Sequence, residues 1–173
     1  MTARRCAALL ATTVLAAALA ACAPASAPTP TPTPTGFASE EEAFAAAEAT
    51  YRAYVDALNR VDLSDPATFE PVYSLLDGEA LASEKKTLTQ MHADGWRVSG
   101  ETEVPSISAG EMPAQILVCQ DVSGVAVVDA AGQSRVSPDR PDIFALDVEI
   151  EQDPTSVTGA RIVASTAIED DRC

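Results

Sequence analysis

The stretch Ala114–Ser123, AQILVCQDVS, is apolar at its centre on both faces of an extended chain. Successive side chains of a strand point to opposite faces, so a strand with one solvated face alternates apolar and polar residues. A strand that is covered on both faces does not alternate. We therefore predict that this stretch is a central strand of a sheet.

The sequence on both sides of this stretch has a period of two, which predicts further strands. The first predicted strand begins at Trp96 and places apolar or β-branched residues at alternate positions, namely Trp96, Val98, Thr102 and Val104. Gly124 precedes a short apolar run at 125–128, and the residues 129–134 are typical of a turn. Two longer strands are predicted after it, one around 144–151 and one over 156–168.

The sequence before Trp96 has the period of helices instead. Ser39 followed by Glu42 forms a capping box, and the apolar residues behind it predict a helix from about Glu40 to Arg60. Asp65-Pro66 begins a short second helix. A third helix is predicted from about Glu79 to Ala93, with an apolar stripe formed by Leu81, Leu88 and Met91. Three helices followed by four to six mainly antiparallel strands indicate an α+β fold, in which a curved sheet packs over the first helix.

Residues 1–21 have the pattern of a signal peptide. Two arginines, Arg4 and Arg5, precede an uncharged run at 7–21, which is too short to cross a bilayer as a mature helix. The motif Leu19-Ala20-Ala21-Cys22 resembles the bacterial lipobox, at which the lipoprotein signal peptidase cuts before the cysteine. The resemblance implies that Cys22 becomes the first residue and carries lipid, with palmitate among the expected acyl groups.

Two or more acyl chains would anchor the protein stably to the outer face of the cell membrane, outside the cytoplasm. Ordinary secretion, with cleavage near Ala23-Pro24-Ala25, is the alternative, and proline disfavours that site. The following residues, 22–35, alternate proline with Ala, Ser and Thr and predict an extended linker of roughly 40 Å. Residues 36–173 remain as one domain.

The chain is acidic, with 11 Lys plus Arg against 26 Asp plus Glu and a formal net charge of −15. Arg4 and Arg5 leave with the signal, so the mature chain is more acidic still. This charge argues against a nucleic-acid partner and against a domain that lies flat on an anionic bilayer. A solvated acidic surface explains it, and cationic partners or divalent ions are the alternative.

Four cysteines are present, and their positions predict different roles. Cys6 lies in the signal and Cys22 at the anchor, which leaves Cys119 and Cys173 in the domain. In an oxidising compartment two cysteines most simply form one disulfide. This bond would tie the C-terminal residue to the sheet and stabilise the fold by about 4 kcal/mol. A free thiol is the weaker alternative.

Several segments also resemble a known family. The stretches TFEPVYSLLDGEALASEKKTLTQMHADGWRVSGET (Thr68–Thr102) and VCQDVSGV (Val118–Val125), with a terminal cysteine after acidic residues, are similar to uncharacterised lipoproteins of high-GC Gram-positive bacteria. The order of helix, short helix, helix and long strands resembles the NTF2-like cone, the superfamily that includes SnoaL and ketosteroid isomerase relatives. This superfamily contains both enzymes and binding modules, so the resemblance implies a fold without an activity.

The resemblance implies a cavity between helices and sheet, which enzymes of this class line with Asp, His or Tyr. The candidate lining residues are Tyr51, Tyr54, His92 and Trp96. His92, close to Asp94, is able to act as a general base near neutral pH. An exposed helix end explains both residues as well, and ordinary packing explains the aromatic ones. We assign no catalytic residue.

No cofactor and no metal site is predicted, because the sequence lacks a calcium-loop pattern, a zinc-helix pattern, a glycine-rich phosphate loop and a nucleophile elbow. The sequence therefore favours a non-catalytic, membrane-anchored module that binds an envelope protein or a small-molecule ligand. A small extracytoplasmic isomerase, dehydratase or hydrolase with a His, Tyr or acid in the cavity is the alternative. The resemblance allows a dimer, although the charge opposes close association.

Overall fold

The computed structural model describes residues 36–112 and 114–173. The predicted signal peptide (1–21) and the linker (22–35), with Cys22, lie outside the described residues. The chain from Thr33 to Cys173 forms one compact unit, and its core cluster and its disulfide lie within it. We therefore expect the segment 33–173 to fold without the residues that precede it. Among the described residues, no helix has the length and apolar character needed to span a membrane.

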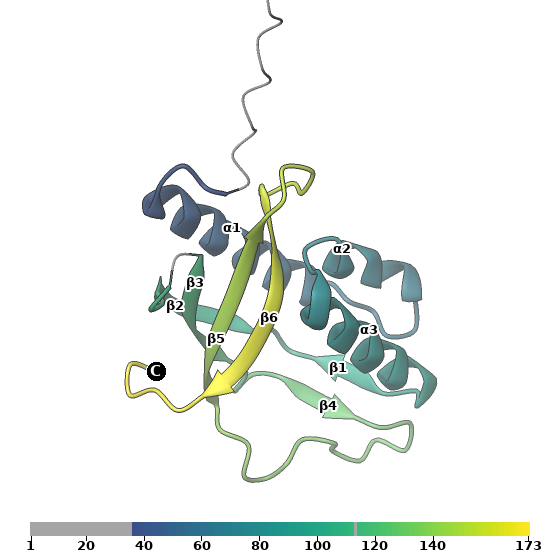
Figure 1. The fold of residues 1–173 in the computed structure, drawn as a ribbon. Helices are drawn as coiled ribbons and strands as arrows, with labels where there is room; N and C mark the ends of the chain where they lie inside the picture. The colour runs from purple at the N-terminus through teal and green to yellow at the C-terminus, as the bar shows by residue number, and fades with distance from the viewer. Residues whose placement is uncertain (1–35, 113) are drawn as a thin grey trace, which may run out of the picture. The chain divides into compact units, whose positions relative to one another are not determined.

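The fold is α+β, as the sequence predicts, with three helices packed against a mainly antiparallel sheet (Figure 1). The helices in the described residues are α1 (Glu40–Leu58), α2 (Glu70–Tyr73), which follows the 3-10 turn η1 (Pro66–Phe69), and α3 (Gly78–Ala93). The strands are β1 (Arg97–Ser99), β2 (Glu103–Ala109), β3 (Gln115–Asp121), β4 (Ala126–Val128), β5 (Ile143–Gln152) and β6 (Ala160–Ile168).

Strand β3 lies inside the larger sheet, where its composition predicts it. The larger sheet has the order β2-β3-β5-β6, and every pairing in it is antiparallel. Strands β1 and β4 form a separate two-stranded antiparallel sheet. In Figure 1 the pair β1–β4 lies below α3, and β5 and β6 cross in front of α1.

Helix α1 begins where the capping box places it. The Ser39 hydroxyl accepts a hydrogen bond from the Glu42 backbone N–H at 3.1 Å, and the Glu42 carboxylate accepts one from the Ala38 N–H at 3.0 Å. These contacts satisfy N–H groups that have no partner inside the helix. The helix then buries Ala47, Tyr51 and Val55 against the sheet.

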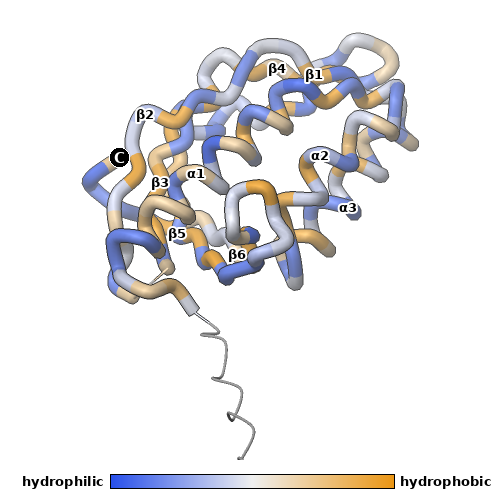
Figure 2. Tube along the Cα trace, turned by 90° about the horizontal axis from the view of Figure 1, so that it is seen from above, coloured by the Kyte–Doolittle hydropathy of each residue, from blue (hydrophilic) through white to orange (hydrophobic). Residues whose placement is uncertain are grey.

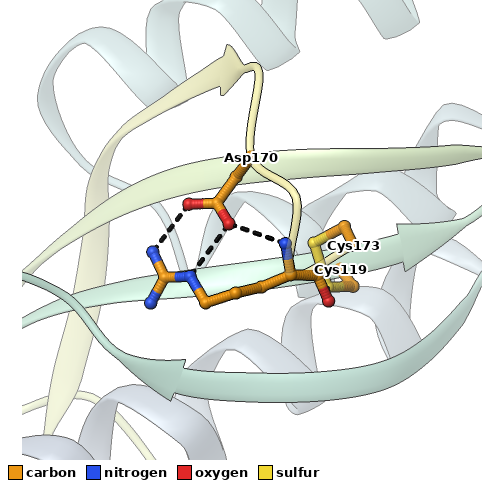
Figure 3. Close-up of a disulfide and its surroundings, with 4 residues drawn as sticks. Cys119, Asp170 and Cys173 are labelled. Atoms are coloured by element: carbon orange, nitrogen blue, oxygen red, sulfur yellow. Dashed lines mark hydrogen bonds and ion pairs between the residues drawn. A yellow bond between two sulfur atoms is a disulfide. The ribbon is translucent and has the colours of Figure 1, made fainter.

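The two faces of β3 are covered by different parts of the chain. Ile116 and Val118 belong to the main core beneath the helices. Leu117 and Cys119 point to the opposite face by the alternation of a strand, and both are buried. A disulfide joins Cys119 to Cys173, with the two Cα atoms 5.4 Å apart, so the chain after β6 turns back over this outer face (Figure 3).

A tight turn orders that C-terminal tail. The Asp170 carboxylate accepts hydrogen bonds from the Arg172 backbone N–H at 2.9 Å and from the Arg172 guanidinium at 2.9 and 2.6 Å. These hydrogen bonds lower the pKa of Asp170 to about 2. The turn places Cys173 beside β3, as Figure 3 shows.

The structure corrects two of the predicted strands. The strand predicted over 156–168 begins only at Ala160, and the strand predicted from Trp96 to Val104 is two strands in two sheets. Gly100 breaks it, with a φ of +83° and with its Cα close to the backbone of Gly124. Beyond this break the Asn59 side chain exchanges two hydrogen bonds with the Thr102 backbone, each 2.9 Å long. The end of α1, rather than the neighbouring strand, therefore holds the chain between β1 and β2.

Replacing Gly100 with Ala is expected to lower the free energy of unfolding by about 3 kcal/mol or more. The left-handed backbone costs a non-glycine residue about 1–2 kcal/mol, and the added Cβ would overlap the Gly124 carbonyl oxygen. Gly132→Ala is the matched control, because Gly132 has a φ of +81° with no atom near its added Cβ. Urea denaturation of the segment 33–173 measures both. Equal losses in the two variants would contradict the close approach.

Breaking the disulfide with Cys173→Ser is expected to lower the free energy of unfolding by about 2–4 kcal/mol. The bond closes a loop between residues 54 positions apart and holds the tail over the buried Leu117 and Cys119. Chemical denaturation with and without reductant measures the loss. The oxidised wild type should lose stability on reduction, whereas the variant should not respond. A variant as stable as the oxidised wild type would contradict this role of the tail.

Candidate functional site

A cavity of about 290 Å³ lies between α1, α3 and the inner face of the larger sheet. Helix α1 contributes Tyr51 and Tyr54, and α3 contributes Glu79, Ser83 and Glu84. The sheet contributes one polar side chain from its centre, Gln120, and hydroxyl groups from β6. We call this space the polar cavity. None of its lining residues is Lys, Arg or His.

The polar cavity has an ordered tyrosine wall. The Tyr51 ring is buried, with 1% of its residue surface exposed, and its hydroxyl donates a hydrogen bond to Gln120 Oε1 at 2.6 Å. The Tyr51 and Tyr54 ring centroids are 5.8 Å apart in a tilted arrangement. Burial, with the nearby Glu84 charge, raises the pKa of both phenols, so both remain protonated donors near neutral pH.

Glu84 is the ionisable group at the centre of this site. Its half-buried carboxylate accepts a hydrogen bond from the Tyr54 hydroxyl at 3.2 Å, which links α3 to α1. Burial raises the pKa of Glu84, and the Tyr54 hydrogen bond only partly opposes this shift. Lys85, next in sequence, lies over the Tyr73 ring, and no ion pair between described residues includes Glu84. The carboxylate is therefore poorly solvated and lacks a positive partner.

A second cavity, of about 250 Å³, lies on the other side of Glu84 along α3. Its wall is mostly aliphatic and comes from the end of α1 and the loop that follows it, from α3, from β1, and from β4 with the residue before it. The aliphatic residues are Leu58, Val61, Leu63, Leu88, Met91, Val98, Val125 and Val127. We call it the apolar cavity. Figure 2 shows both hydrophobic and hydrophilic colours along α3, the helix that borders both spaces. Glu84 lines both cavities.

The structure brings together only two of the four residues that the sequence proposes as cavity lining. Tyr51 and Tyr54 line the polar cavity, whereas His92 and Trp96 line a separate open groove of about 600 Å³ near Asp62. His92 follows Glu84 by eight positions, which turns its side chain roughly 80° around the helix.

His92 and Trp96, which line this groove, are each engaged in a contact with another part of the protein. His92 Nδ1 lies 2.6 Å from the Leu63 carbonyl oxygen, and the Trp96 ring packs under the Arg135 guanidinium at 4.8 Å. Asp94 accepts a hydrogen bond from Gln90, not from His92. The arrangement of the described residues therefore pairs His92 with backbone rather than with an acid.

Glu84 and Gln120 were not identified from the sequence, although each leaves a signal. Glu84 follows Leu81 by three positions and precedes Leu88 by four, so it lies in the predicted apolar stripe of the third helix. Gln120 shares a strand face with Ile116 and Val118, which belong to the core. Both residues are polar and lie at positions that the pattern assigns to the core, on a helix stripe for Glu84 and on a strand face for Gln120.

Solved structures are similar to this chain in fold. The intermembrane-space region of the chloroplast protein ARC6 is 14% identical over 72% of this chain and 95% of its own, with a TM-score of 0.46. An NTF2-like protein of unknown function from Exiguobacterium is 14% identical over 70% and 98%, with a TM-score of 0.41. No protein-family model and no curated protein matches the chain. These are structural similarities alone, and one of the two structures is an NTF2-like protein.

Replacing Glu84 with Gln is expected to raise the melting temperature of the segment 33–173 at pH 7.5 and to change it little at pH 3.5. Burial raises the folded-state pKa of Glu84 above its unfolded value of about 4.3. The wild type therefore loses stability as the pH rises from the unfolded through the folded pKa, and the neutral amide avoids this loss.

Circular dichroism melting curves at the two pH values measure this effect. Glu103→Gln, at an exposed position of β2, is the matched control and should not reproduce it. A Glu84→Gln protein that is less stable than the wild type at pH 7.5, and equally stable at pH 3.5, would show that ionised Glu84 is favourably paired.

Proposed function

We propose that this protein is a lipid-anchored binding module on the outer face of the cell membrane, and that its polar cavity binds a small ligand with a positively charged group. The ligand assignment rests on Glu84, whose carboxylate accepts a hydrogen bond from Tyr54. Glu84 lines the polar cavity, and no Lys, Arg or His is among the residues that line it. The lipobox-like motif that ends at Cys22 supports the anchor.

The charge distribution favours a cation. Two carboxylates, Glu79 and Glu84, line the polar cavity, so an anionic ligand would be repelled. Two unit charges 4 Å apart attract by about 4 kcal/mol at the effective dielectric constant typical of sites near a protein surface. A bound ammonium group would therefore supply the partner that Glu84 lacks.

The domain architecture supports a tethered module. The predicted linker 22–35 would hold the compact unit away from the bilayer, where a soluble ligand or another envelope component is able to reach it. The acidic surface of the chain reduces close contact with anionic lipid headgroups.

An enzyme is the second candidate, and Glu84 is the observation that favours it. A carboxyl group with a raised pKa beside a protonated phenol is suited to general acid–base chemistry in an isomerase, a dehydratase or a hydrolase. The two functions differ in the fate of the ligand. A binding module returns it unchanged, whereas an enzyme converts it in a reaction that Glu84→Gln abolishes.

Ethylamine is expected to bind the polar cavity more tightly than ethanol or acetate, which have a similar size and a neutral or negative charge. Chemical-shift titration of the segment 33–173 measures affinity and place, and the largest shifts should occur at Tyr51, Tyr54 and Glu84. Glu84→Gln should lower the ethylamine affinity about tenfold, and Glu103→Gln should not change it. Equal affinity for acetate and ethylamine would contradict a cation site.

Replacing Cys22 with Ser is expected to abolish lipidation of the full chain. The wild type should fractionate with membranes and show a mature mass that begins at Cys22 and includes acyl groups. The serine variant should lack the acyl mass and accumulate with its signal uncleaved. Mass spectrometry of the purified protein measures both. A wild-type start downstream of Cys22 without fatty acid would contradict the anchor.

A further inference from the structure

The polar and apolar cavities meet at one side chain. Along α3, Glu79 and Ser83 line the polar cavity, and Thr87 and Met91 line the apolar cavity. Glu84 lies between these pairs and forms part of both walls. A ligand beside this side chain therefore has a polar space and an aliphatic space within reach.

The apolar cavity is suited to a hydrocarbon group. Glu84 is the one charged residue among those that line it. The amide of Asn59, which also lines it, is already paired twice with the Thr102 backbone and offers little to a polar ligand. Burial of an alkyl group against the surrounding aliphatic side chains is favourable because it removes apolar surface from water.

A ligand cation is able to replace the hydrogen bond that Glu84 accepts from Tyr54. Tyr54 donates to Glu84 at 3.2 Å, which is long for a bond between two oxygen atoms. An ammonium group offers Glu84 a charge-assisted hydrogen bond, which is stronger than one from a neutral phenol. A cation at this point would take the place of the Tyr54 hydroxyl on the carboxylate.

We infer that the ligand is a cationic amphiphile, with an ammonium head against Glu84 and an alkyl chain in the apolar cavity. This inference rests on the proposed function and adds the chain to it. A fatty acid would place a second carboxylate beside Glu84 and Glu79, and a fatty alcohol would leave Glu84 without a counter-charge. A short amine would leave the apolar cavity unused.

Titrations of the segment 33–173 with octylamine, ethylamine, octanol and octanoate, each below its aggregation concentration, separate the head from the chain. Octylamine is expected to bind at least a hundredfold more tightly than ethylamine, because each buried methylene increases affinity about three- to fourfold. Octylamine should also bind at least tenfold more tightly than octanol or octanoate. In Glu84→Gln its advantage over octanol should fall below threefold, and Glu103→Gln should keep the wild-type order.

Two variants test the position of the chain. Val98, which is 44% exposed, and Thr87, which is also exposed, both line the apolar cavity, so either position should accept a larger residue without unfolding. Val98→Trp and Thr87→Trp are each expected to lower octylamine affinity at least tenfold and to leave ethylamine affinity unchanged. Amide spectra of each variant confirm that it is folded before titration.

The outcomes distinguish this inference from the proposed function. Binding of neither amine would overturn both. Ethylamine binding as tight as octylamine binding would overturn the chain placement and leave the cation site intact. Octanol or octanoate binding as tight as octylamine binding would overturn the cationic head. Full octylamine affinity in both folded tryptophan variants would place the chain elsewhere and overturn the inference.

Discussion

The hydrogen bond from Tyr54 to Glu84 joins α1 to α3, and Glu84 lines both the polar and the apolar cavity. The helices carry their remaining apolar residues against β3, β5 and β6, and Glu84 interrupts the apolar stripe of α3. An aliphatic residue at this position would extend the core. A carboxylate instead leaves a poorly solvated negative charge, and the proposed ligand specificity follows from that charge.

Contacts on the outer face of the sheet supply stability that offsets the cost of the cavities on its inner face. The C-terminal tail, held by the Cys119–Cys173 disulfide, lies over Leu117 and Cys119. In the described part of the chain, the core beneath the helices therefore covers one side of the central strand, and the tail covers the other. Stability supplied by this covalent link is able to offset the unfavourable burial of Glu84, as in proteins that trade stability for function.

Local patterns in the sequence predicted much of the fold. The capping box, the helical periods and the doubly apolar stretch Ala114–Ser123 each act through neighbouring residues, and the structure contains the elements that they predict. The division of the strand after Trp96 depends on Gly100 meeting Gly124, a contact between residues far apart in sequence. The alternation of residues 96–104 holds no sign of that contact.

The site was predicted less completely, and the reason is geometric. Tyr51 and Tyr54 follow from the apolar stripe of α1, but His92 and Trp96 were grouped with them by residue type rather than by position. The charge of Glu84 is typical of a solvated helix face, although its spacing from Leu81 and Leu88 places it on the buried one.

The most direct measurement is the pKa of Glu84, followed by carbon-detected NMR of its side-chain carboxyl group in the segment 33–173, with and without saturating ethylamine. In the free protein the pKa should lie above the ordinary value of a glutamate, and bound ethylamine should lower it. A pKa at or below the ordinary value in the free protein, unchanged by the amine, would contradict the central role of an unpaired, poorly solvated carboxylate.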